Sequence, residues 1–133
     1  MIYLLDTDIC IGLLRGAAAK AATKLSRLPA SDVALCSVVI YELLLGAEKC
    51  NQFDKEMAKV QAFVQPFVSL PFDDECARLC AKIRAELERI GHPIGPCDYQ
   101  IAAITKRHKL TLVTRNVLEF QRVPGLKVEN WEN

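Results

Sequence analysis

The sequence predicts an α/β fold whose central sheet is mainly parallel. Two observations lead to this class. Short apolar runs, suited to buried strands, alternate along the chain with longer segments in which apolar residues recur every three or four positions, as on one face of a helix. Strands that are separated by helices cannot pair as hairpins, so they pair in parallel and are covered by helices on both faces.

Length and composition limit the number of domains and the kinds of function. The 133 residues, 51% of them hydrophobic, suffice for a single core, so we expect residues 1–133 to form one domain. No segment has the apolar length that crosses a bilayer, and the N-terminus lacks the basic flank of a signal peptide, which predicts a cytoplasmic protein. The net charge of +1 excludes nucleic-acid binding by bulk electrostatics alone. Any nucleic-acid role therefore needs a local site.

Each element follows from a local pattern. Apolar runs predict strands at residues 2–5, 33–36, 68–70, 111–113 and 128–129. Helical periodicity predicts helices at residues 8–15, 17–28, 37–47, 51–63, 73–90 and 97–108, and a helical turn at 117–120. Ser37 is expected to cap the third helix through its hydroxyl. The six cysteines are scattered through apolar stretches of a chain without a secretion signal, which predicts reduced core thiols.

One carboxylate stands where the first strand passes into the first helix. Asp6 follows the apolar run 2–5 directly and is followed by Thr7 and Asp8. Open α/β sheets bind ligands beyond the carboxyl ends of their strands. We therefore expect Asp6 at the rim of the sheet, as the anchor of an active site.

Other polar residues are predicted to reach the same edge. Asn116 follows a later strand, and Glu119 lies three residues further on, on a helical turn that points it back to this edge. Glu42 lies within the apolar stretch 38–45, where a buried charge needs a cation or a cavity. Asp98 lies in the first turn of its helix, where the macrodipole favours an anion.

Each acid also has a structural explanation. Taken singly, Asp98 is better explained as a helix-start acid and Glu119 as a surface charge, and Asp6 or Asp8 can cap a helix. Taken together, the acids form a cluster whose like charges stay ionised only beside a cation. Oxygen ligands favour Mg²⁺ or Mn²⁺, and a metal that keeps positions for water and phosphate suits hydrolysis of a phosphodiester.

A series of short motifs extends along the whole chain in a characteristic order and spacing. They are residues 3–9, the Glu42 helix, residues 83–87, Gly91, residues 93–96, Asp98 and residues 101–103, and a tail made of residues 113–116, 119–120, 123–126 and 128–131. In this arrangement the chain resembles the VapC-type toxins, which are the PIN-domain ribonucleases of type II toxin–antitoxin modules.

The resemblance implies a PIN-like α/β/α sandwich and an endoribonuclease that depends on Mg²⁺ or Mn²⁺. Asp6, Glu42 and Asp98 match the family's principal acids: Asp6 and Asp98 as metal ligands, and Glu42 as a ligand through water or a base that orients the nucleophile. Asn116 stands at the fourth site, with Glu119 nearby. The tail resembles the branch that cuts tRNA in the anticodon region, including initiator tRNA. The resemblance further implies a VapB-type antitoxin that blocks the acidic pocket, and a homodimer.

Two positions depart from the family's pattern. Position 8 is Asp where the family more often has Asn. The extra carboxylate of Asp8 can raise metal affinity or cap the first helix, and we favour the capping role. Position 116 is Asn where the wider PIN family has Asp, which removes a charged ligand from a second metal. Arg115, beside Asn116, is expected to contact RNA phosphates. Lys106, Arg107 and Lys109 are better explained as cations that stabilise a helix C-terminus.

Two other classes of protein fit part of the pattern. A strand followed by Asp6-Thr7-Asp8 also matches the nucleophile motif of haloacid-dehalogenase-type phosphatases, in which Asp6 becomes phosphorylated. That class needs a downstream Lys and a paired acid motif, and the loop after Val113 offers only Asn116. The other class is a non-catalytic PIN module that binds RNA or a protein partner. Asn116 supports it, and the presence of all three principal acids opposes it.

Overall fold

The computed structural model describes residues 1–133 and contains a five-stranded sheet in which all neighbouring strands are parallel. The strands are β1 (Tyr3–Leu5), β2 (Val33–Cys36), β3 (Val68–Leu70), β4 (Thr111–Val113) and β5 (Lys127–Glu129). Their spatial order is β3-β2-β1-β4-β5, so β1 occupies the centre. The predicted α/β class and parallel sheet are confirmed.

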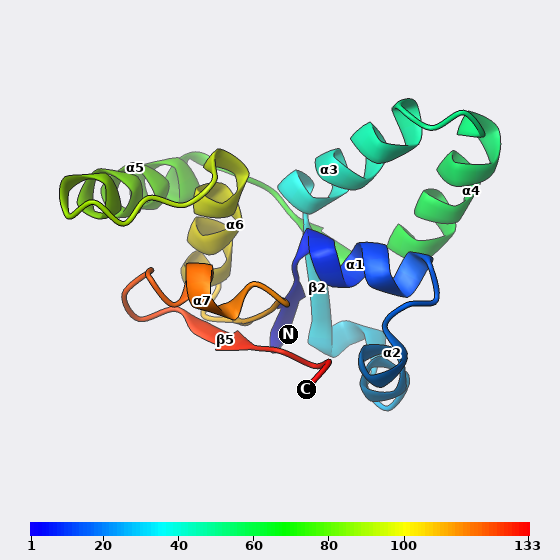
Figure 1. The fold of residues 1–133 in the computed structure, drawn as a ribbon. Helices are drawn as coiled ribbons and strands as arrows, with labels where there is room; N and C mark the ends of the chain where they lie inside the picture. The colour runs from blue at the N-terminus through cyan, green and yellow to red at the C-terminus, as the bar shows by residue number, and fades with distance from the viewer.

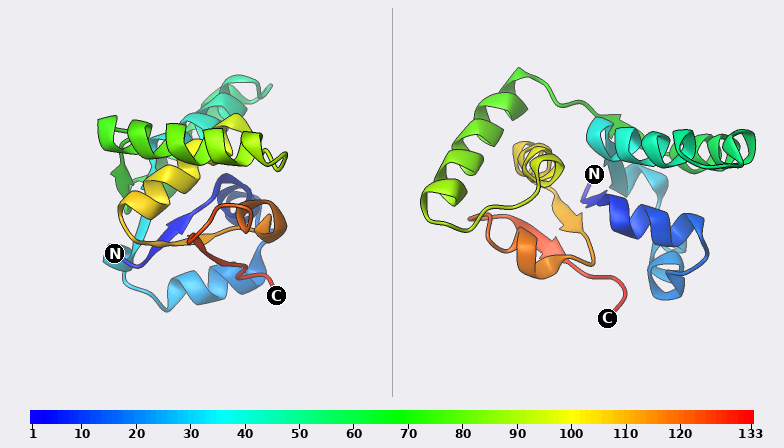
Figure 2. Two further views of the ribbon diagram at one scale, coloured as in Figure 1. Left: turned by 90° about the vertical axis from the view of Figure 1, so that its left-hand side faces the viewer. Right: turned by 45° about the horizontal axis from the view of Figure 1, so that its top comes forward.

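Helices connect successive strands and cover the sheet. They are α1 (Thr7–Leu14), α2 (Ala19–Ser26), α3 (Ser37–Glu48), α4 (Phe53–Val64), α5 (Asp74–Arg89), α6 (Pro96–Arg107) and the short α7 (Val117–Phe120), with a 3-10 turn at Ala30–Asp32. Figure 1 shows α3 and α4 next to α1 on one side of the molecule and α5 and α6 on the other, and the right-hand view of Figure 2 shows the same separation. No helix is long and apolar enough to cross a bilayer.

The core lies between the sheet and these helices. All four residues of β2 are buried, as are Leu4 and Leu5 of β1 and the stretch 101–105 of α6. Burial of whole strands explains why they are continuous apolar runs instead of alternating ones. Because α6 is held in the core along most of its length, its N-terminal turn is fixed relative to the strand ends.

The order in which strands join the sheet changes side at β1. From β1 the chain adds β2 and then β3 on one side, and afterwards β4 and β5 on the other. Such a switch in strand order leaves a crevice beyond the carboxyl ends of the strands, which is where doubly wound sheets bind ligands. Asp6 stands at this point, directly after β1.

The start of α3 differs from the prediction. Cys36, the last residue of β2, has an extended backbone and takes the N-cap position, whereas Ser37 is already the first helical residue. The strand runs into the helix without a linker, so no residue is left over to serve as a separate cap. The Ser37 hydroxyl instead accepts the backbone N–H of Phe72 at 3.2 Å, which ties α3 to the segment after β3. The prediction that Ser37 caps α3 is therefore wrong.

Candidate active site

Asp6 is held rigidly between the two central strands. Its backbone N–H donates to the carbonyl of Val113 at 2.8 Å, and its side chain is 5% exposed. Oδ1 accepts the backbone N–H of Thr7 at 2.8 Å, and Oδ2 accepts the hydroxyl of Thr114 at 2.7 Å. Asp6 is also the N-cap residue of α1, with extended φ and ψ angles of −74° and 162°. Both carboxylate oxygens are thus fixed at the rim of the sheet.

Asp8 faces the same rim and does not cap its helix. Its carboxylate accepts the backbone N–H of Arg115 at 3.1 Å and lies 3.2 Å from the Thr114 hydroxyl. Since β1 ends immediately before α1, the N-cap position belongs to Asp6, and Asp8 is left to bond the loop after β4. The capping role expected for Asp8 is therefore wrong.

Glu42 reaches the site from α3. The Thr7 hydroxyl donates to Glu42 Oε1 at 2.6 Å, which joins the first turn of α1 to the middle of α3. This contact supplies the polar partner that a carboxylate in an apolar helix requires. Glu42 and Asp6 are thereby linked through a single residue, Thr7.

Glu119 and Asn116 form a bridge to the N-terminus of α6. The Asn116 amide donates to Glu119 Oε2, and Glu119 Oε1 accepts the backbone N–H of Gly95 at 3.0 Å. The backbone N–H of Asn116 donates to the Thr114 hydroxyl at 3.0 Å. Asp98 lies near enough to Glu119 for the charge of Glu119 to raise the pKa of the Asp98 carboxyl. The segment after β4 is therefore connected to the loop that precedes α6.

The loop before α6 is shaped to leave room for Asp98. Gly95 has an extended backbone and precedes Pro96, which is well placed in the first turn of a helix. A Cβ atom at Gly95 would lie 3.0 Å from Asp98 Oδ2, closer than ordinary van der Waals contact. The Tyr99 hydroxyl accepts the backbone N–H of Ile94 at 3.1 Å and the ring is 1% exposed, so Tyr99 supports this loop and is not available to stack on a base.

The electrostatics show that these acids form one cluster. Burial, reinforced by the charges of Asp8 and Glu42, raises the pKa of Asp6 to about 7 in spite of the bonds from Thr114 and Thr7. Burial, together with Asp6, Glu119 and Glu42, raises the pKa of Asp98 to about 7 as well. Each shift has neighbouring carboxylates among its causes, so the acids repel one another when they are ionised, and a bound cation would favour their ionised forms.

The donor set fits a hard divalent cation. As the side chains lie, no three of the acids, cysteines or histidines are close enough together to enclose one ion. Mg²⁺ is bound in many enzymes by one or two carboxylates and keeps several waters, so it does not require a closed protein cage. Asp6 and Asp98 offer oxygen donors, and Glu42 stands near enough to affect the pKa of both. This cluster is therefore suited to an ion that remains largely hydrated.

Arg115 lies next to the site but its side chain points away from the acids. The guanidinium donates from Nη2 to the Ala17 carbonyl at 3.3 Å and stands 3.7 Å from Glu132 Oε1. It also packs over Gly12, where a Cβ atom would lie 2.8 Å from Nη2. These contacts join the C-terminal tail to the turn between α1 and α2. They favour a structural role for Arg115 over the expected contact with RNA.

Two site residues were not predicted as such, namely Thr7 and Thr114. Thr114 is fully buried, and its hydroxyl contacts Asp6, Asp8 and the backbone of Asn116. Because Leu5 pairs with Val113 in the sheet, Asp6 and Thr114 stand at equivalent positions just beyond two adjacent strands. Aligning the predicted ends of these strands would have indicated Thr114.

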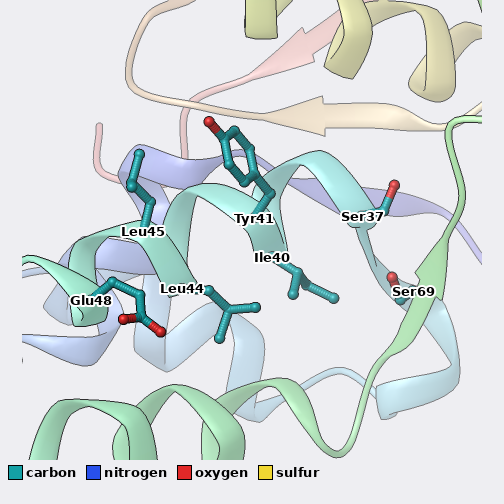
Figure 3. Close-up of a pocket in the computed structure, with 7 residues that line it drawn as sticks. All are labelled: Ser37, Ile40, Tyr41, Leu44, Leu45, Glu48 and Ser69. Carbon is teal, nitrogen blue, oxygen red and sulfur yellow. The ribbon is translucent and has the colours of Figure 1, made fainter. Parts of the chain in front are cut away.

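Two hollows flank the acids without containing most of them. A groove of about 360 Å³ between α1, α3 and α4 has Glu42 in its lining, together with Ile11, Arg15 and Lys59. A second, apolar pocket of about 400 Å³ lies on α3 and β3 (Figure 3) and contains none of the site acids. Tyr41 lines this second pocket and is 56% exposed.

Comparison with known proteins agrees with the fold and the site. The PIN domain family model matches residues 3–126. The tRNA(fMet)-specific endonuclease VapC of Shigella flexneri is 36% identical over 129 residues, which is 97% of each chain. Ribonuclease VapC2 of Rickettsia felis is 33% identical over 133 residues and 99% of each chain.

Solved structures are similar over the same length. VapBC2 from Rickettsia felis bound to promoter DNA contains a chain that matches with a TM-score of 0.92 and 32% identity, covering 98% of this chain and 99% of that one. DNA-bound VapBC from Salmonella typhimurium matches with a TM-score of 0.93 and 32% identity over 98% of each. These similarities favour a nuclease over a phosphatase with Asp6 as nucleophile. The chain belongs to the PIN-domain family, among its VapC ribonucleases.

Proposed function

We propose that this chain is the toxin of a type II toxin–antitoxin pair and a Mg²⁺- or Mn²⁺-dependent endoribonuclease that cuts tRNA in the anticodon region, with initiator tRNA as the substrate. The observation that carries the proposal is the acidic cluster in which Thr7 joins Asp6 to Glu42, and in which Asp6 and Glu42 both raise the pKa of Asp98. The full-length similarity to a tRNA(fMet)-specific endonuclease supports the choice of RNA.

The residues divide into ligands and positioning groups. A bound divalent ion would polarise the phosphodiester and make a water molecule more acidic. Asp6 and Asp98 would bind the ion directly, while Glu42 would bind it through water or accept a proton from the attacking water. Thr114 holds Asp6 in place, and Thr7 holds Glu42 in place.

The remaining polar residues support this set. Glu119 and Asn116 fix the loop before α6 and so the position of Asp98, and both are weaker candidates for metal binding. Asp8 shares Thr114 with Asp6 and bonds the Arg115 backbone, so its contribution is to hold the loop after β4 and to add negative charge.

We propose a VapB-type antitoxin as the regulatory partner. The groove between α1, α3 and α4 leads to Glu42 and offers apolar walls with both charge signs at its edge, which suits an amphipathic segment of another protein. A basic side chain from that segment would neutralise the acidic pocket and compete with the metal. The proposal further includes a homodimer and a cytoplasmic location, with residues 1–133 acting as one domain.

Cellular RNA after induction gives the direct test of the substrate. The unmodified protein and its Asp6→Ala variant are induced side by side, and new 5′ ends are mapped across the transcriptome. We expect new ends in the anticodon loop of initiator tRNA with the unmodified protein only, and their suppression when a cognate antitoxin is co-expressed. New 5′ ends in other RNAs that depend on Asp6 would support the ribonuclease activity but contradict initiator tRNA as the substrate. Identical profiles for the two proteins would contradict the proposed activity.

A further inference from the structure

A basic pocket lies at the end of the sheet opposite to the acids. It has a volume of about 210 Å³ and is lined by Lys106, Lys109, Leu110, Gly125, Leu126 and Lys127. Lys106 belongs to the last turn of α6 and Lys127 begins β5. Since the strands are parallel, the start of β5 lies at the edge away from Asp6, which follows the end of β1. We call this hollow the lysine pocket.

No carboxylate neutralises the lysine pocket. Its lining contains three lysines and no acid, and none of the three forms an ion pair within the chain. The Lys106 ammonium is held in place by a 2.6 Å bond to the carbonyl of Pro124. Gly125, with a φ of 75°, lies beside Lys106, and a Cβ atom there would only make ordinary van der Waals contact with its Nζ at 3.6 Å. Ammonium groups gathered in this way attract an anion.

The backbone of Lys109 adds an independent observation. Lys109 has a φ of 56°, and the other residues of the chain with positive φ are all glycines. It follows α6 in a turn closed by the bonds from Leu110 N to Thr105 O at 3.0 Å and from Lys109 N to Lys106 O at 3.1 Å. Glycine or asparagine is usual at such a helix end, since a longer side chain is strained in this conformation. Residues whose backbone is held in a strained conformation cluster at functional sites.

We propose that the lysine pocket binds backbone phosphates of the RNA substrate at a distance from the bond that is cut. This inference rests on the proposed function, because it takes a folded RNA as the substrate. Asp98 and Lys106 are on the same helix, about 12 Å apart along its axis. Asp98 lies in the first turn of α6 (Figure 1) and Lys106 in its last turn, so one folded RNA can contact both ends of this helix. Phosphate contacts of this kind position a nucleic acid without selecting its sequence.

Binding in the absence of catalysis tests the proposal. The triple variant Lys106→Gln, Lys109→Gln, Lys127→Gln is compared with a matched control, Lys20→Gln, Lys55→Gln, Lys82→Gln, whose lysines are exposed and also unpaired. Affinity for a full tRNA transcript is measured in EDTA by fluorescence anisotropy at several salt concentrations. We expect the first variant to bind at least fivefold more weakly, with a salt slope reduced by about 2 to 3, and the control to change little. An arginine triple variant at the same three positions should bind normally.

One further variant separates the possible outcomes. Lys109→Gly should raise the melting temperature by a few degrees while weakening tRNA binding, since it removes the strain together with the charge. An equal loss of tRNA affinity in the pocket variant and in the control would contradict the lysine pocket as a specific binding site. Loss of binding confined to the pocket variant, with no cleavage by any protein, would overturn the proposed function alone.

Discussion

The Thr114 hydroxyl lies 2.7 Å from Asp6 Oδ2, although the two residues are 108 positions apart in the sequence. The same hydroxyl is 3.2 Å from Asp8 and accepts the backbone N–H of Asn116. It carries one hydrogen and so donates to one carboxylate at a time, with Asp6 as the nearer acceptor. Thr114 therefore determines how Asp6 is presented to the pocket.

Replacing Thr114 by valine is expected to impair the site more than the fold. Valine fills the same space but cannot donate to Asp6, which loses a bond that favours its ionised form. Loss of a group that orients a metal ligand typically lowers activity or metal affinity by about 10- to 100-fold. Single-turnover cleavage and Mn²⁺ titration measure the two effects.

Thr105→Val is the matched control for Thr114→Val. Thr105 is also fully buried, and its hydroxyl donates to the Ile101 carbonyl within α6, away from the acids. Both variants should lose stability by about 1 kcal/mol. If Thr105→Val lowers cleavage as strongly as Thr114→Val, the effect reflects general destabilisation and not the bond to Asp6.

Removing the Thr7 hydroxyl is expected to lower kcat while leaving KM nearly unchanged. The 2.6 Å bond from Thr7 orients Glu42, and the Thr7 hydroxyl is engaged in this bond. Thr7→Val should therefore reduce kcat by about tenfold or more if Glu42 positions the attacking water. Thr7→Ser keeps the hydroxyl and should retain most activity. A normal kcat for Thr7→Val would show that the bond from Thr7 to Glu42 does not contribute to catalysis.

The stability of the metal-free protein is expected to fall as the pH rises. The pKa of Asp6 is about 7 in the folded protein against an ordinary value of 3.8, so between these values the folded state holds a proton that the unfolded chain releases. Stability is then lost as the pH rises through this window, by about 1.4 kcal/mol for each pKa unit, and the raised pKa of Asp98 acts in the same direction. Thermal melts in EDTA from pH 4.5 to 8 measure the effect.

Asp6→Asn and added metal provide the controls for this pH dependence. Asparagine has no charge to bury, so the variant should melt at a temperature that depends less on pH. Mg²⁺ should stabilise the unmodified protein more at pH 8 than at pH 5, since it binds the ionised carboxylates. A melting temperature in EDTA that rises between pH 5 and pH 8 would contradict the pKa shifts on which the cluster is argued.

Arg115→Gln is expected to act on stability instead of RNA binding. The guanidinium joins Ala17 to Glu132, so its loss should lower the melting temperature by about 2 to 4 °C, equivalent to about 1 kcal/mol. Affinity for tRNA in EDTA should change by less than about twofold. A much weaker affinity at an unchanged melting temperature would restore Arg115 as a ligand of RNA phosphates.

Much of the fold could be predicted because polar residues or proline mark where its strands end. The strands at 33–36, 68–70 and 111–113 and the helix at 117–120 have the predicted bounds, although only Leu70 of β3 is buried. Helix ends were less predictable. The helix expected at 17–28 forms only at Ala19–Ser26, because Gly16 has a φ of 67° and Ala18 is not helical.

The site was predictable where it depends on strand ends and not where it depends on side-chain direction. The position of Asp6 follows from the parallel sheet alone. The roles of Asp8 and Arg115 depend on which N–H or carbonyl group their side chains meet, and those partners lie far away in the sequence. The raised pKa values depend on burial by the assembled fold and have no signal in the local sequence.

The central claim is that Asp6, Glu42 and Asp98 form one metal-dependent ribonuclease site. Its most direct test is the rate at which antitoxin-free protein cleaves initiator tRNA as free Mg²⁺ is varied, with Asp98→Asn measured in parallel. We predict a saturable dependence on Mg²⁺, no cleavage in EDTA, and an Asp98→Asn enzyme that needs a higher Mg²⁺ concentration and remains slower at saturation. Cleavage that persists in excess EDTA, at equal rates for both proteins, would contradict the claim.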